Sequence, residues 1–222
     1  GMRFGVHEMY TSDALVSGNV IRDTNVGVIV MTEPEGNVVL NNDVRQSNSG
    51  TMVAGSSSYI AGNLFAENDI GMYVSAKDSV YEGNVVINND RGMRSSLLLP
   101  TTRVTDNDIV GNRRSVTSAL GPLQVWSGNY WENAIGRDRN RDGVLDRAYI
   151  PTSTLGSKLD RVPGASTLAL SPAVDVVREF RDTVPGLRST GVMDNSPRVR
   201  PVHPEIIEEY RQNSTDTERK QR

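Results

Sequence analysis

One histidine and three methionines are the side chains of this sequence best suited to binding a soft metal ion. His7 and Met9 are two residues apart in the segment GVHEM, and Met31 and Met52 belong to the similar segments GVIVM and GTMVA. If these segments are β-strands, alternate side chains point to one face, so that His7 and Met9 lie together. Imidazole and thioether groups are ligands that Cu(I) favours. The pattern predicts a copper site, unless a loop or partner covers these side chains.

Oxygen ligands recur at alternate positions of the segment DRNRDGVLD, residues 138–146. This spacing, with a glycine at the sixth position, copies the first part of an EF-hand calcium loop. The twelfth position holds Tyr149 in place of the bidentate glutamate, and two arginines reduce the negative charge. A turn held by Asp and Asn hydrogen bonds to the backbone is the alternative. The candidate Ca²⁺ ligands are Asp138, Asn140, Asp142, the carbonyl of Val144, and Asp146.

Three aromatic residues, Trp126, Tyr130 and Trp131, precede this loop. Aromatic rings near a loop can stack on sugars. However, the two tryptophans occupy positions that are apolar throughout the repeat described below, and the end of a repeat structure needs a cap over its apolar surface. We therefore expect both tryptophans to close the end of the core.

No arrangement typical of catalysis is visible. Glycosidases need paired carboxylates on one face, whereas the acidic residues of the repeats fall mostly in turns. The sequence contains no cysteine, and no nucleophile stands beside a base. We predict a binding scaffold that is not an enzyme. The alternative is a carbohydrate-active protein whose catalytic residues lie outside this sequence.

A short unit recurs through residues 1–133: Gly-Asn or a related polar pair, one residue, an apolar residue and a polar turn. The copies are GNVIRDT, NNDVRQS, GNLFAEN, GNVVINN, DNDIVGN and GNYWENA, at intervals of roughly 22 residues. Such a period, with two or three short extended segments per copy, predicts a right-handed parallel β-helix of about six coils. The aligned asparagines, which should stack in a hydrogen-bonded ladder, are Asn19, Asn42, Asn63, Asn84, Asn107 and Asn129.

A glycine precedes one extended segment of each copy and defines which side chains face the core. The residue after the glycine should point inward, as should the residue two positions later; these columns contain Val28, Thr51, Met72 and Met93, then Val30, Val53 and Val74. Outward columns follow, namely His7, Ile29, Met52, Tyr73 and Arg94, and beside them Met9, Met31, Ala54, Ser75 and Ser96. Glu8 should face inward, which conflicts with its charge.

Four segments are predicted. Residues 1–133 form the coils, residues 134–165 an Asp-rich closing loop, residues 166–183 a segment with a helix over 171–182, and residues 184–222 an extended, partly disordered tail with a short helix over 205–212. The formal net charge of −3 argues against nucleic acid as the main partner. No apolar run reaches the roughly 20 residues that span a bilayer, and no export signal is visible.

The segment GVHEMYTSDALVSGN, the Gly-Asn coils, SGNYWENAIGRDRNRDGVLDRAY and LSPAVDVVREF together resemble the NosD family. The resemblance covers residues 3–180. It implies an extracytoplasmic, periplasmic β-helix protein that assists copper delivery to nitrous oxide reductase, with an ABC transporter membrane subunit and a copper chaperone as further partners. The acidic loop is less dense in Asp and Gly than is usual in the family, and the tail beyond about residue 185 has no counterpart there.

Overall fold

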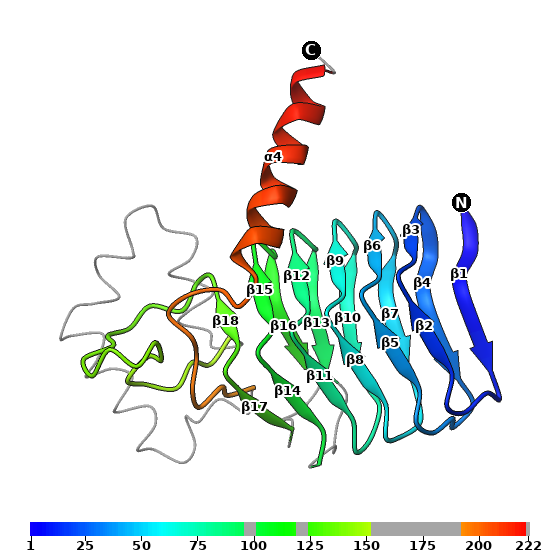
Figure 1. Ribbon diagram of the computed structural model, residues 1–222, viewed down its shortest axis with the longest axis horizontal. Helices are drawn as coiled ribbons and strands as arrows, with labels where there is room; N and C mark the ends of the chain where they lie inside the picture. Colours follow the sequence, from blue (N-terminus) through cyan, green and yellow to red (C-terminus); the bar gives the residue numbers. More distant parts are fainter. Residues whose placement is uncertain (96–100, 119–123, 152–191, 221–222) are drawn as a thin grey trace.

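The computed structural model describes residues 1–95, 101–118, 124–151 and 192–220, and it confirms the parallel β-helix. Within these residues the chain winds through three parallel sheets of six strands each, stacked in coils along the long axis of the molecule (Figure 1). The first coil consists of β1 (Met2–Met9), β2 (Leu15–Ser17) and β3 (Val20–Arg22), and each later coil adds one strand to each sheet.

The sheets that begin with β1, β2 and β3 are called sheets A, B and C. Sheet A continues from β1 through β4 (Thr24–Met31), β7 (Ser49–Val53), β10 (Ile70–Val74), β13 (Arg91–Ser95) and β16 (Arg114–Ser118). Sheet B continues from β2 through β5 (Val38–Leu40), β8 (Tyr59–Ala61), β11 (Val80–Glu82), β14 (Arg103–Thr105) and β17 (Val125–Ser127). Sheet C continues from β3 through β6 (Asp43–Arg45), β9 (Leu64–Ala66), β12 (Val85–Ile87), β15 (Asp108–Val110) and β18 (Tyr130–Trp131).

The asparagine ladder lies at the corner between sheets B and C, in the predicted register. The side-chain amide of Asn63 donates to Oδ1 of Asn84 at 2.9 Å and to the carbonyls of Val39 and Ala61 at 2.9 and 3.0 Å. The same pattern runs from Asn19 to Asn129. Each amide thereby satisfies backbone groups that a tight buried turn leaves without partners.

A second ladder, which the sequence analysis missed, lies at the corner between sheets C and A. Asn89 donates its side-chain amide to Oδ1 of Asn112 at 2.9 Å, and its own Oδ1 accepts the backbone N–H of Asn68 at 2.8 Å. The column stands five residues after each asparagine of the first ladder. It begins with Thr24 and Ser47, which hides the asparagine repeat in the sequence.

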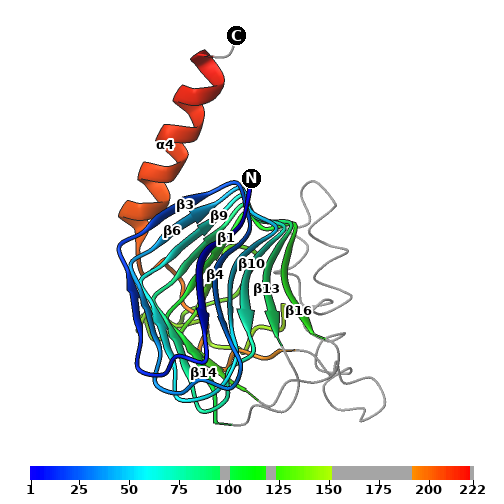
Figure 2. The same cartoon turned by 90° about the vertical axis from the view of Figure 1, so that its right-hand side faces the viewer.

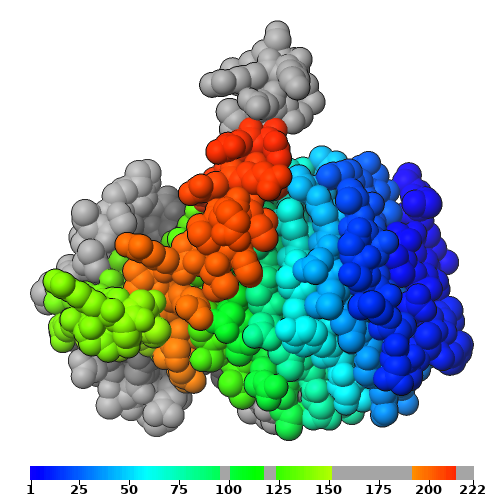
Figure 3. Space-filling model, viewed as in Figure 1, coloured from blue at the N-terminus to red at the C-terminus, as the bar shows by residue number. Residues whose placement is uncertain are grey.

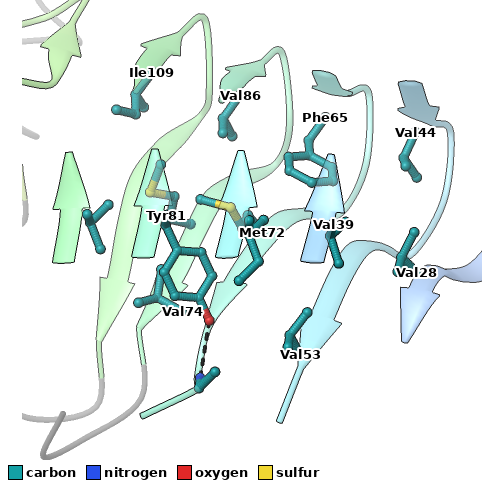
Figure 4. Close-up of a cluster of buried hydrophobic side chains, with 14 of the residues drawn as sticks. Val28, Val39, Val44, Val53, Phe65, Met72, Val74, Tyr81, Val86 and Ile109 are labelled. Carbon is teal, nitrogen blue, oxygen red and sulfur yellow. Dashed lines mark hydrogen bonds between the residues drawn. The ribbon is translucent and has the colours of Figure 1, made fainter. Parts of the chain in front are cut away.

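The core is a stack of inward columns, two from sheet A and one each from sheets B and C (Figure 4). Val28, Thr51, Met72 and Met93 are fully buried, as predicted. The glycines of sheet A allow the columns to approach: a Cβ at Gly50 would lie 2.2 Å from the carbonyl oxygen of Gly71. Tyr81 is the polar member, and its hydroxyl accepts the backbone N–H groups of Ser75 and Ala76 at 3.1 Å.

The C-terminal segment caps the last coil and then crosses the outside of sheet C. Asp194 forms a parallel bridge with Trp126, and Arg198 forms one with Tyr130, so residues 192–199 add a partial coil. Helix α4 (Pro204–Lys220) follows (Figure 2). Ile207 and Tyr210 of its first turns pack on an outward apolar patch of sheet C, and Figure 3 shows this segment lying over the last coils.

Part of the segment predicted to be an extended, partly disordered tail is therefore ordered. The short helix predicted over 205–212 is present within α4, which continues to Lys220. The apolar side chains of α4 that pack on sheet C explain why this helix forms, because isolated helices are only marginally stable without such packing. The predicted helix over 171–182, residues 152–165 of the closing loop, and Ser96 lie outside the described residues.

Candidate metal centre

Strands β1 and β4 bring the predicted copper ligands to one outer face. Met9 is the direct register partner of Met31, and His7 is the partner of Ile29. Adjacent strands in a sheet lie ~4.8 Å apart, so the two methionines are neighbours. Their side chains are 45% and 38% exposed, and His7 is exposed as well. Solvent therefore reaches all three residues, and none of them belongs to the hydrophobic core.

Met52 lies in the column that begins at His7, two coils from His7 and one coil beyond Ile29. It is the partner of Ile29 in the pairing of β4 with β7, and it is half-buried. Ile29, which lies between His7 and Met52 in the same outward column, is only 4% exposed. Met52 is thus two strands from His7 and is placed to assist a ligand set but not to complete one alone.

Aromatic and backbone contacts hold the first strand in place around these donors. The rings of His7 and Phe4 are 4.4 Å apart between centroids and tilted by 45°. Directly after Met9, the N–H of Tyr10 donates to Oγ1 of Thr32 at 2.9 Å, and both residues have positive φ angles of 57° and 72°. The two strands therefore turn away together just after the methionine pair, which leaves the thioethers at a rim.

The donor set of this patch is soft and carries no formal charge except on a protonated histidine. Such donors fit Cu(I), which accepts two or three sulfur or nitrogen ligands, better than they fit a hard cation. Within the described parts of the chain, no three His, Cys, Asp or Glu side chains are grouped so as to hold a metal.

The closing loop is held by hydrogen bonds from its own carboxylates. Asp138 accepts the backbone N–H groups of Asp142 and Gly143 at 3.1 and 3.0 Å, and Asp142 accepts that of Val144 at 2.9 Å. Asp146 accepts the N–H of Arg139 and lies 3.7 Å from its guanidinium. These contacts favour the turn over the calcium site as the explanation of the spacing. The calcium site proposed from the sequence at Asp138–Asp146 is the alternative to this turn.

The tryptophans are core residues, as predicted. Trp126 and Trp131 are buried, with their ring centroids 6.0 Å apart, and Trp131 also contacts Tyr149 of the closing loop. They close the end of the stack and offer no open platform for a sugar. Tyr130 is half-buried against the patch under α4.

A buried carboxylate, which the sequence analysis did not single out, anchors the start of α4. Asp108 lies on the outside of sheet C and is fully buried under the C-terminal segment. Its two oxygens accept the backbone N–H groups of Val202 and His203, each at 2.8 Å. Burial raises the pKa of the Asp108 carboxyl, although these hydrogen bonds lower it in part. No signal in the sequence links it to residues more than 90 positions away.

The chain is a parallel β-solenoid whose first two coils present His7, Met9 and Met31 on an outer face. A sequence model of the NosD family, described as periplasmic copper-binding protein, matches residues 1–136, and the chain belongs to this family. The probable ABC transporter binding protein NosD of Stutzerimonas stutzeri is 35% identical over 102 residues, which are 44% of this chain and 23% of that protein.

A second relative gives the same result. The probable ABC transporter binding protein NosD of Pseudomonas aeruginosa PAO1 is 34% identical over 102 residues, again 44% of this chain and 24% of that protein. The matched part thus spans about a quarter of the length of either relative. Both relatives are named as binding proteins. None of the helices in the described residues is long and apolar enough to cross a membrane.

Proposed function

We propose that this chain is part of a periplasmic copper carrier and that Cu(I) binds at His7, Met9 and Met31, with Met52 assisting. The observation that carries the proposal is the register pairing of Met9 with Met31, both exposed, on the face that also presents His7. Exposed methionines that pair across strands have no packing role that explains them, because methionine ordinarily fills cores.

The geometry suits a carrier that must release its cargo. Two thioethers and an imidazole can hold Cu(I) without a charged cage, and an open rim lets an incoming ligand replace them one at a time. The contact with Phe4 restricts the imidazole of His7, so less side-chain freedom is lost on binding. The β-helix contributes rigidity, since the ladders and the core hold β1 and β4 in register.

The destination of the copper in this proposal is nitrous oxide reductase. A copper chaperone would load the patch, and an ABC transporter membrane subunit would be the further partner. Support comes from the family description as a periplasmic copper-binding protein and from the names of the two relatives. Copper is cargo in this scheme, and the chain carries out no chemical step on it.

Cu(I) competition on the purified chain tests the proposal against the carbohydrate-active alternative. The protein is titrated into a complex of Cu(I) with a coloured chelator under reducing, anaerobic conditions, and in parallel with a panel of oligosaccharides. We expect one Cu(I) per chain and no sugar binding. Sugar binding without Cu(I) binding would favour the alternative.

A further inference from the structure

Four arginines gather on the last described strands of sheet A, at the opposite end of the face that carries the methionines. Arg91 of β13 is the direct partner of Arg114 of β16. Arg94 of β13 belongs to the outward column that begins at His7, and its partner on β16 is Thr117. Arg113 adjoins them in the turn before β16. Arg94, Arg113 and Arg114 are exposed. This set, Arg91, Arg94, Arg113 and Arg114, is called the arginine cluster.

Ion pairing within the protein accounts for only part of the arginine cluster. Asp90 forms ion pairs with Arg91, at 3.7 Å, and with Arg113. Within the described residues, Arg94 and Arg114 have no direct ion pair, although Asp90 is near enough to Arg114 to interact with its charge. The guanidinium of Arg94 lies 5.6 Å from the ring centroid of Tyr73. Asp69 is the other carboxylate in the neighbouring turn of the stack and is exposed. The cluster therefore keeps a net positive charge on a chain whose formal charge is −3.

Folding alone does not explain this placement. Like charges directly opposite one another on adjacent strands are destabilising, and Arg91 and Arg114 occupy such positions. A guanidinium presents a planar fork of donors that matches a carboxylate, and two such forks side by side recognise closely spaced carboxylates. A bound acidic ligand would offset the electrostatic repulsion between Arg91 and Arg114.

The arginine cluster is continuous with the metal patch along two outward columns. One column runs from Phe4 through Val26, Ser49 and Ile70 to Arg91 and Arg114. The other runs from His7 through Ile29 and Met52 to Tyr73 and Arg94. The two ends are four coils apart, or about 19 Å at ~4.8 Å per coil. Of the residues between them, Val26, Ile29 and Ile70 are buried, and Tyr73 is half-buried.

We propose that this face of sheet A is a docking surface for an acidic, extended segment of a partner protein, whose carboxylates bind the arginine cluster. The inference rests on the proposed function, because a partner bound at the arginine cluster would extend along these columns toward His7, Met9 and Met31. The spread of Arg91, Arg94 and Arg114 over two adjacent strands suits an extended polypeptide segment that carries several carboxylates.

The test uses the metal-free chain and a fluorescently labelled hexaglutamate peptide as the probe, followed by fluorescence anisotropy. We expect binding that weakens steeply with added NaCl. The double variant Arg94→Gln/Arg114→Gln should weaken binding by roughly tenfold or more, because two charge-assisted contacts are lost. The double variant Arg94→Lys/Arg114→Lys keeps the charge but not the planar fork of donors, so its affinity for the peptide should lie between those of the wild type and the double Gln variant.

A matched control removes the same charge elsewhere. Arg103 and Arg200 are exposed outside sheet A, and Arg103→Gln/Arg200→Gln should change binding less than about twofold. Equal losses in the two Gln variants, or no binding at low salt, would overturn the proposal. Displacement by hexagalacturonate at lower concentration than by unlabelled hexaglutamate would assign the cluster to an acidic sugar instead. Because no copper is present, this result is independent of the Cu(I) titration.

Discussion

Asp194 occupies the position that the next asparagine of the first ladder would take after Asn129, although the two residues are 65 positions apart. Its Oδ2 accepts the backbone N–H of Asn129 at 3.1 Å and the side-chain amide at 2.8 Å. The same oxygen accepts the indole N–H of Trp131 at 3.0 Å. One carboxylate thereby terminates the ladder and holds the tryptophan that closes the core.

Asp194→Ala should therefore destabilise the protein strongly. Three donors lose their acceptor in a fully buried place, and each unsatisfied buried group costs about 1–3 kcal/mol. Asn195→Ala, at an exposed neighbouring position, is the control and should have little effect. Urea unfolding of both variants is the measurement. Equal stability of the two variants would mean that the C-terminal segment does not cap the last coil in solution.

Mid-stack asparagines should be structural as well. Asn63→Ala or Asn84→Ala removes an acceptor for two donors of the preceding coil and a donor to its carbonyls, at a cost of about 1–3 kcal/mol. Asn25→Ala, which loses one exposed hydrogen bond to Asn48, should cost much less. The measurement is the unfolding midpoint of each variant relative to the wild type. Unchanged midpoints for both Asn63→Ala and Asn84→Ala would contradict the assigned register.

The stability contributed by Asp108 should depend on pH in an unusual direction. Burial raises the pKa of its carboxyl above the value of about 3.9 expected for the unfolded chain, so the folded protein binds the proton more tightly. That contribution is fully present at low pH and is lost as the pH rises through the folded pKa. The free energy of unfolding of the wild type, relative to Asp108→Asn, should therefore increase as the pH falls from about 7 towards about 4. An advantage that grows with rising pH would refute this.

Calcium should leave the closing loop unaffected. Asp138 and Asp142 already accept backbone N–H groups, and the positive charges of Arg139 and Arg141 repel a Ca²⁺ ion. Ligand binding to the folded state raises its apparent stability, so the melting temperature with millimolar Ca²⁺ and with EGTA tests the point. A rise with Ca²⁺ that disappears in Asp138→Ala would establish the calcium site.

Local repetition made most of the scaffold predictable. The asparagine and glycine spacings were sufficient to place Met9 beside Met31, because in a parallel stack the repeat length alone defines which residues are partners. The contacts of Asp194 and Asp108 were not predictable, since each joins a coil to a segment far along the chain with no repeat to align it. The burial of Ile29 was not predictable either, because a column position specifies the face of a side chain but not how exposed that side chain is.

Copper binding should depend on the methionine pair and not on methionine content. Met9→Leu and Met31→Leu keep the size of the side chain, remove a thioether and should barely alter the melting temperature, because exposed positions contribute little packing energy. Met193, exposed at the opposite end of the stack, is the matched control in the variant Met193→Leu. Met72→Ala, in the core, should cost about 2–5 kcal/mol in stability and leave the copper site intact.

The most direct measurement is the Cu(I) dissociation constant of the wild type, Met9→Leu, Met31→Leu and Met193→Leu by chelator competition. We predict that each variant of the pair weakens Cu(I) binding by roughly tenfold or more, as the loss of one of two or three ligands implies, and that Met193→Leu binds like the wild type. Wild-type affinity in both Met9→Leu and Met31→Leu would contradict the assignment of the copper site to β1 and β4.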